Sequence, residues 1–392
     1  MTGALDGIRI VDLSAVVSGP WCCQILADQG ADVIKVEPLE GDITRRGGYR
    51  VEDISAMFMA CNRGKRSVAL DLSTEDGITA VKRLIATADV FIQNFRPGAC
   101  ERMGIGYEAL REVRPDLIYV SISGFGPTGP YSQWRVYDPI IQAISGVVST
   151  QRSLDIPIPD LVRTIIADKS TGLTAAQSIT AALLARAQGR AGGQHLEIPM
   201  LDSLLYFLWP DNFNGETFTG DVTPGALLHD IYRVQATADG QLVYFAVTDS
   251  EWQGLCNALG HPEWWEDPRF NEATRRSTHA AELGALLDTA FRAVPTEELL
   301  ARLHDHQVPA APINDLTDMF EDPQVVHNEA IHHWDHPLMG PVRTAKPPVR
   351  FSETPADPRW AADKLGQSTR EVLGEIGYDD IELATLAEKG VI

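Results

Sequence analysis

One carboxylate in this sequence stands where it could either do chemistry or begin a helix. The stretch VRTIIADKSTGLTAAQ, residues 162–177, places Asp168 after an apolar run and before a segment rich in small residues. Asp is a favoured N-cap residue, because its side-chain oxygen accepts the unpaired N–H groups of a first helical turn. A carboxylate with an ordinary pKa of about 3.9 is also ionised at neutral pH and can act as a nucleophile without a separate base. The residues around Asp168 leave both roles open.

Two other patterns resemble binding motifs but do not meet the requirements of those motifs. GFGPTG at 124–129 matches the GxGxxG of dinucleotide sites, which works only if the loop opens directly into a helix. Pro127 and Pro130 argue against that helix, so we expect no nicotinamide site. HHWDH at 332–336 holds three His and one Asp, but it lacks HExxH spacing and lies among loop signals. We expect surface histidines in a loop there, and no metal.

The charge is strongly acidic overall but uneven along the chain. A formal net charge of −21 makes the molecule as a whole a poor partner for nucleic acid, whose binding requires a basic face. Residues 45–114 nevertheless hold twelve Lys or Arg against nine Asp or Glu, including Lys65 and Arg102. Salt screens exposed charges over about 8 Å, so a local basic patch can bind a small anion on an acidic molecule. We therefore predict an anion site among these cations.

The first part of the chain alternates strand and helix signals, which predicts an α/β fold with an open, largely parallel sheet. Ligands of such sheets gather on loops beyond the carboxyl ends of the strands. Those loops would be residues 14–19, 94–98 and 124–130. The expected strands are 8–13, 32–37, 67–72, 89–95, 116–123 and 195–200, and the expected helices are 20–30, 74–88, a long one from 169, and 201–209.

A change in composition and in the pattern of strand and helix signals predicts a second, smaller α+β domain. Residues 232–248 read as two strands joined by a turn at Asp239-Gly240, and helical segments follow at 249–260 and 279–305. At 392 residues, two domains are expected. We divide the chain into residues 1–224, a small domain at 225–330, and a last segment at 331–392.

The sequence also favours a cytoplasmic protein that does not enter a membrane. It shows no basic start followed by a long apolar run, and no stretch of about 18 apolar residues. The five cysteines have no CxxC spacing, so we expect buried thiols rather than disulfides or a zinc site.

Several motifs, in order along most of the chain, resemble the class III CoA-transferases, also called the CaiB/BaiF family. They are LDGIRIVDLSAVVSGPWCCQILADQGADVIKVE (5–37), NRGKRSVALDL (62–72), DVFIQNFRPG (89–98), GYEALREVRPDLIYVSISGFGPTGPY (106–131), YDPIIQAISGV (137–147) and IADKSTGLTAAQSITAALLAR (166–186). The resemblance implies a Rossmann-like large domain that residues 331–392 return to complete, with the small domain between. It also implies an interlocked homodimer and coenzyme A or acyl-CoA as substrate, with no prosthetic group.

The resemblance assigns roles to individual residues. Asp168 matches the position of the family's nucleophile, which forms an acyl-aspartyl anhydride and then an aspartyl-CoA thioester. The CoA-binding positions that match are Val16, Val17, Ser18, Lys65, Asn94, Phe95, Arg102 and Arg135. Position 38 is Pro where some members place Arg, so one phosphate contact is not carried over.

Two alternatives to CoA transfer stay open. Racemases of the family place a His before the Asp of the segment YDPIIQ, where this chain has Tyr137. A phenol with a pKa of about 10 is a poor base at neutral pH, so Tyr137 favours transfer over racemisation. Asp138 is a secondary catalytic candidate that also precedes a proline. An acyl-CoA-binding protein without activity is the third reading, and Asp168 argues against it. The donor and acceptor acids do not follow from any motif.

Overall fold

The chain divides into a large and a small unit in a computed structural model that describes residues 3–152, 158–223, 232–336, 339–356, 358–359 and 361–392. The large unit is Met1–Phe213 with Ala330–Ile392, and the small unit is Asn214–Glu329. The expected start of the small domain, residue 225, lies outside the described residues.

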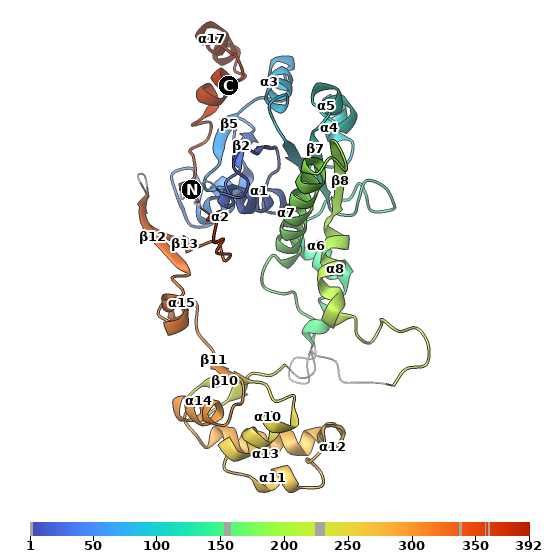
Figure 1. Ribbon diagram of the computed structural model, residues 1–392, viewed down its shortest axis with the longest axis vertical. Helices are drawn as coiled ribbons and strands as arrows, with labels where there is room; N and C mark the ends of the chain where they lie inside the picture. The colour runs from blue at the N-terminus through green and yellow to red at the C-terminus, as the bar shows by residue number, and fades with distance from the viewer. Residues whose placement is uncertain (1–2, 153–157, 224–231, 337–338, 357, 360) are drawn as a thin grey trace. The chain divides into compact units, whose positions relative to one another are not determined.

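The large unit is built on a six-stranded parallel sheet with the order β5-β2-β1-β6-β7-β8 (Figure 1). Its strands are β1 (Arg9–Asp12), β2 (Asp32–Glu37), β5 (Arg66–Ala69), β6 (Val90–Gln93), β7 (Ile118–Ser123) and β8 (Gln194–Pro199). The predicted α/β fold with a parallel sheet is therefore confirmed. The strand order reverses between β1 and β6, and in such sheets the crevice beyond that reversal is the usual ligand site.

Helices cover both faces of the sheet, because successive strand residues point to opposite faces. Ile10 packs into one apolar cluster and Val11 into the other. The first cluster joins the sheet to α1 (Ser18–Asp28), α6 (Asp138–Ser145), α7 (Ile166–Ala187) and α8 (Met200–Asn212). The second joins it to α3 (Glu75–Ile85), α5 (Tyr107–Val113), α16 (Thr369–Glu375) and α17 (Asp380–Glu388). Shorter elements are β3 (Arg50–Val51), β4 (Ile54–Ser55), α2 (Ala56–Asn62) and α4 (Ala99–Arg102).

The last part of the chain returns to the edge strand β5. Ser67 N–H donates to the Asp363 carboxylate at 3.0 Å, and Ala69 N–H donates to the Thr369 hydroxyl at 3.0 Å. These bonds use backbone groups that an edge strand would otherwise expose. Figure 1 shows this C-terminal segment, in red, beside the blue N-terminal elements.

The HHWDH segment is a strand and not the loop we expected. β12 (Ile331–His336) pairs antiparallel with β13 (Gly340–Ala345). Alternation along the strand sends neighbouring side chains to opposite faces, which separates the adjacent histidines. Among the described residues, no group of three His, Cys, Asp or Glu is placed to hold a metal ion.

The small unit combines a three-stranded antiparallel sheet, β11-β10-β9, with helices. The predicted hairpin is β9 (Gln235–Ala236) and β10 (Gln241–Tyr244), and β11 is Ala310–Pro312. The helices are α10 (Asp249–Ala258), α11 (Glu263–Glu266), α12 (Ala273–Thr278), α13 (Ala280–Arg292), α14 (Thr296–Asp305) and α15 (Pro323–His327). The single segment expected at 279–305 is two helices, because Pro295 precedes the first turn of α14 and cannot continue α13.

Through the described part of the chain, no helix combines the length and the apolar character that crossing a bilayer demands.

Candidate active site

The loop after β1 holds a strained residue. Val16 has φ 70°, in the left-handed region that β-branched side chains rarely adopt. Such a conformation costs roughly 1–3 kcal/mol and persists only where the surroundings enforce it. Here the Val16 N–H donates to Oδ2 of Asp42 at 3.2 Å. The turn thus depends on a contact far from it in sequence.

A pair of hydrogen bonds joins this loop to the loop after β6. The Asn94 side chain accepts from Ala15 N–H at 2.9 Å and donates to the Ala15 carbonyl at 2.7 Å. Because β1 and β6 flank the reversal of strand order, the two loops border the crevice that the topology predicts. Asn94, predicted to contact CoA, uses its amide to fix the loop that carries Val16, Val17 and Ser18.

Helix α1 begins at this loop and brings Ser18 to Asp168. The Ser18 N–H donates to Oδ1 of Asp168 at 3.2 Å. The close approach of α1 and α7 depends on Gly172, one turn after Asp168. A Cβ at Gly172 would lie 2.9 Å from the Ser18 carbonyl oxygen, closer than such atoms pack. The glycine in IADKSTGL therefore has a packing reason.

The helix cap, one of the two roles left open for Asp168, is provided by Asp138. Helix α7 begins at Ile166, so Asp168 is its third residue, and no side chain of the N-cap residue Ile165 caps it. Oδ2 of Asp138, the first residue of α6, accepts from Ala167 N–H at 2.7 Å and from Asp168 N–H at 3.1 Å. Both carboxylates are buried, with exposed fractions of 2% for Asp138 and 8% for Asp168.

Burial and the charge of Asp138 raise the pKa of Asp168 to about 6, while hydrogen bonds from Ser18 oppose the shift. At neutral pH the group is still mostly ionised, and it is more basic than an ordinary aspartate. A partly desolvated carboxylate of this kind is a suitable nucleophile, because less water must leave it before it attacks.

A pocket of about 280 Å³ brings together four of the predicted residues: Asn94, Phe95, Arg135 and Tyr137. It lies beyond the ends of β6 and β7, and Tyr137 directly precedes the capping residue Asp138. Trp134 and Arg96 also line it, although neither was predicted to contact CoA. The sequence held a signal for Arg96, because this residue lies within the 94–98 loop that was expected to border a ligand site.

Lys65 does not fit the phosphate contact we predicted. It is 3% exposed, and its ammonium donates to Asp12 at 2.8 Å, to the Pro20 carbonyl at 2.7 Å and to Asn62 at 2.8 Å. An ammonium has three N–H donors, so all are used inside the protein.

Part of the predicted basic patch is a set of internal ion pairs. Four of its cations bind carboxylates that precede residue 45 in the chain. The pairs are Lys65–Asp12 at 2.8 Å, Arg63–Asp28 at 2.7 Å, Arg66–Asp32 at 2.7 Å and Arg45–Glu37 at 2.7 Å. Arg102 differs, because it is exposed, and within the described ranges no carboxylate lies at ion-pair distance from it. Its guanidinium lies beside Gly98, at the start of α4.

The GFGPTG loop behaves as expected. It follows β7 and opens into turns, and the next helix is α6 at Asp138. No helix N-terminus is therefore placed after it to receive a pyrophosphate.

Comparison with known proteins identifies the family. The family model described as CoA-transferase family III matches residues 5–369. The chain is 37% identical to a succinate–glutarate CoA-transferase of Agrobacterium fabrum, over 95% of each chain. It is 32% identical to a formyl-CoA:oxalate CoA-transferase of Escherichia coli O6:H1, over the whole of both. The crystal structure of a CaiB/BaiF family protein from Brucella suis superposes with a TM-score of 0.83 at 35% identity, covering 96% of this chain and 100% of that one. The chain therefore belongs to CoA-transferase family III, the CaiB/BaiF family, and is an enzyme of that class.

Proposed function

We propose that this enzyme moves CoA from an acyl-CoA thioester to a carboxylic acid, with Asp168 as the nucleophile. The observation that carries the proposal is the setting of Asp168: a buried carboxylate with a raised pKa, bonded to Ser18 N–H, at the crevice where the β1 and β6 loops meet.

The reaction balances without a redox step or an external base. An oxygen of Asp168 attacks the thioester carbonyl, and CoA leaves as the thiolate, giving a mixed anhydride. The thiolate then attacks the aspartyl carbonyl of that anhydride, which forms an aspartyl-CoA thioester and releases the donor acid. The acceptor carboxylate attacks the aspartyl carbonyl and expels the thiolate again. Attack of the thiolate on the acceptor's acyl carbon gives the new thioester and restores Asp168.

The Ser18 N–H is placed to assist these steps. It already donates to Oδ1, so it can donate to the oxygen on which negative charge develops when the aspartyl carbonyl is attacked. Such a donor acts in a site from which much of the water is excluded, where hydrogen bonds to a developing charge are strongest.

For CoA itself, we propose that the backbone of Val16, Val17 and Ser18 forms one side of the binding site. Phe95 and Arg135, in the pocket, and Arg102, outside it, are proposed along the CoA chain and its phosphates. Their exposure supports this role, because a phosphate needs donors that are not already used inside the protein.

The acids are proposed from the relatives. One relative is a succinate–glutarate CoA-transferase, and another is a formyl-CoA:oxalate CoA-transferase. Short carboxylic acids, dicarboxylates first, are therefore the substrates to test here.

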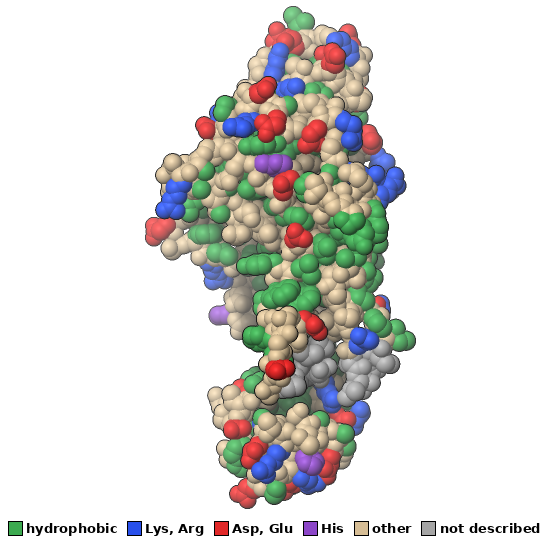
Figure 2. All heavy atoms as spheres, turned by 90° about the vertical axis from the view of Figure 1, so that its right-hand side faces the viewer, with side chains coloured by type: hydrophobic (Ala, Val, Ile, Leu, Met, Phe, Trp, Pro, Cys, Tyr) green, Lys and Arg blue, Asp and Glu red, His purple; other side chains and the backbone are tan. Residues whose placement is uncertain are grey.

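We also propose a homodimer. Large apolar side chains on α6 and α8 are left exposed: Ile140 at 43%, Ile144 at 40%, Tyr206 at 82%, Phe207 at 52% and Trp209 at 48%. Figure 2 shows hydrophobic side chains gathered on the side of the molecule where α8 lies in Figure 1. Contiguous apolar surface of this kind marks interaction sites. Light scattering that gives one chain per particle at micromolar concentration would contradict the dimer.

The covalent step is tested by trapping. Enzyme given succinyl-CoA is quenched with hydroxylamine and digested, and mass spectrometry should place the hydroxamate on the peptide that holds Asp168. Asp168→Asn should give no adduct and no transfer. Asp160→Asn, at an exposed aspartate eight residues earlier, is the matched control and should keep both. Unchanged transfer by Asp168→Asn would overturn the mechanism.

A further inference from the structure

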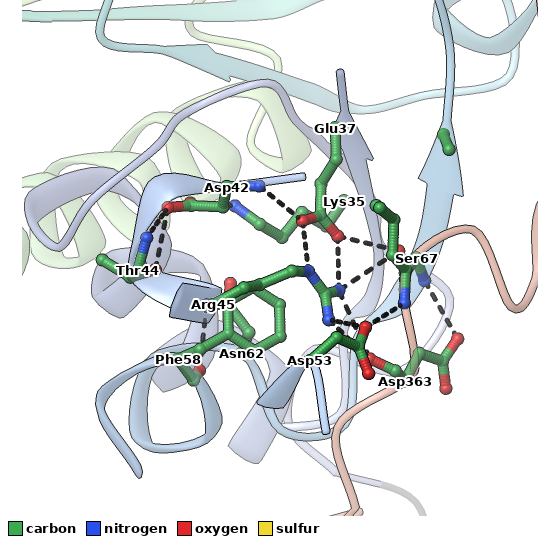
Figure 3. Close-up of polar contacts among 12 residues, drawn as sticks. Lys35, Glu37, Asp42, Thr44, Arg45, Asp53, Phe58, Asn62, Ser67 and Asp363 are labelled. Atoms are coloured by element: carbon green, nitrogen blue, oxygen red, sulfur yellow. Dashed lines mark hydrogen bonds and ion pairs between the residues drawn. The ribbon is translucent and has the colours of Figure 1, made fainter. Parts of the chain in front are cut away.

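A buried polar network lies beneath the β1 loop, and no step of the transfer reaction uses it. Asp42 and Lys35 are each 1% exposed at the side chain and form an ion pair at 3.1 Å. Figure 3 shows this pair beside Glu37 and Arg45, which continue the network toward Asp363. Burying charges costs free energy even when they are paired, so the presence of this network calls for a physical reason.

Asp42 is saturated with donors from three segments. Oδ1 accepts from the Thr44 N–H at 2.9 Å and from the Thr44 hydroxyl at 2.8 Å, and Oδ2 accepts from Lys35 Nζ and from Val16 N–H at 3.2 Å. Lys35 in turn donates to the Ser14 carbonyl at 2.9 Å. The pair therefore binds the β1 loop at two backbone positions on either side of Ala15.

The position of Val16 explains why the loop needs such an anchor. A valine at φ 70° returns to negative φ unless a contact opposes it. Rotation about that residue would also turn the start of α1, two residues on, where Ser18 N–H meets Asp168.

We infer that Asp42 is a positioning residue for CoA transfer: by accepting from Val16 N–H it holds the strained turn that aims Ser18 N–H at the nucleophile. Lys35 is its buried counter-ion and the second support of the loop. This inference rests on the proposed role of Asp168, but the conformation of the loop can be measured without any chemistry.

The test is a double-mutant cycle with glycine. Glycine adopts positive φ about as readily as negative, so a loop with Gly at position 16 no longer depends on the anchor. Asp42→Asn should lower kcat/KM by about 10- to 100-fold, the size expected when a reacting group is misplaced. In the Val16→Gly background the same substitution should cost much less. Equal losses in both backgrounds would overturn the inference, because a general structural role would not depend on residue 16.

Two further measurements complete the test. Asp53→Asn is the matched control, because Asp53 reaches the same network through Arg45 at 3.1 Å but makes no contact with the loop; kcat/KM should be unchanged. Hydrogen exchange of the peptide covering residues 13–19 should quicken in Asp42→Asn and not in Asp53→Asn, and no change in Asp42→Asn would overturn the inference. Because exchange needs no substrate, it separates a failure of this inference from a failure of the proposed nucleophile, which Asp168→Asn tests.

Asp42→Asn should fold, since Lys35 still faces the charges of Asp12 and Glu37. If it does not, Thr44→Val carries the same cycle, because it removes one hydrogen bond to Asp42 and keeps the ion pair. A smaller loss that Val16→Gly again reduces is then expected, and a loss independent of residue 16 refutes the inference.

Discussion

Replacing Asp168 by asparagine should abolish transfer and stabilise the protein at neutral pH. The folded protein holds the pKa of Asp168 at about 6, against an ordinary value of 3.8. A pKa difference of about 2 corresponds to about 3 kcal/mol, which is the upper limit of the cost of ionising this buried carboxylate in the folded state.

The sign of the pH dependence follows from the direction of the shift. A carboxyl whose pKa is raised on folding binds its proton more tightly in the folded chain. The wild-type free energy of unfolding therefore falls as pH rises from about 3.8 to about 6, because the unfolded chain loses this proton more readily than the folded chain does. Asparagine is neutral throughout and can still accept from Ser18 N–H. Its advantage should be largest above pH 7 and should shrink toward pH 5.

Thermal unfolding midpoints of wild type and Asp168→Asn, measured from pH 5 to pH 8, test this reasoning. Asp267→Asn is the opposite control, because hydrogen bonds from Arg269 lower the pKa of Asp267 to about 2, and removal of this carboxylate should bring no gain at neutral pH. Two results would show that the folded structure does not disfavour ionisation of this carboxylate at position 168. One is an unfolding midpoint for Asp168→Asn below that of wild type at pH 7.5, and the other is a difference between the two midpoints that does not change with pH.

Six other substitutions, at five positions, have distinct expected outcomes. Asp138→Asn keeps an acceptor for the first turn of α7 but removes a negative charge beside the nucleophile, so the acid limb of kcat/KM should move to lower pH; Asp138→Ala should in addition cost about 1–2 kcal/mol of stability by denaturant titration. Gly172→Ala should force α1 and α7 apart and slow transfer, and wild-type kinetics would show that the contact yields without cost. Arg102→Ala should weaken CoA binding in calorimetry, most at low salt, whereas Lys65→Met should lower the unfolding midpoint through the unpaired Asp12; the reverse pattern would restore Lys65 as the phosphate contact. Tyr137→Phe should keep transfer, and wild type in heavy water should put no deuterium beside the thioester carbonyl of a 2-methylacyl-CoA; steady uptake without transfer would indicate a racemase.

The architecture of the large unit was readable from the sequence because its strands are short apolar runs bounded by turn signals. Parallel strands buried on both faces give that pattern, as β2 and β6 do. The turn at Asp239-Gly240 was readable for a similar local reason. Where helices are interrupted was less readable, because one proline divides α13 from α14 within an otherwise continuous helical pattern.

The internal pairing of cations in the basic patch could not be predicted, because a charge count over one segment ignores carboxylates outside that segment. Lys65 and Arg63 lie in the counted segment, while Asp12 and Asp28 do not. Only the parallel sheet and α1 bring these carboxylates to the cations. The same limit hid Asp42, whose contact with Val16 spans 26 residues and depends on a backbone angle that no side-chain pattern encodes.

Under the proposed mechanism, the two roles considered for Asp168 belong to two different carboxylates. A helix N-terminus offers several unpaired N–H groups, and one carboxylate that accepts them all would be stabilised in its ionised form and become a weak nucleophile. Asp138 accepts the N–H groups of Ala167 and Asp168, so the hydrogen bonds that reach the Asp168 carboxylate come from Ser18 alone among the residues described. The charge of Asp138 then adds to burial and makes Asp168 more basic. Hydrogen bonds from a helix N-terminus favour the ionised carboxylate and lower its pKa, so the raised pKa of Asp168 supports its proposed role as nucleophile rather than a role as helix cap.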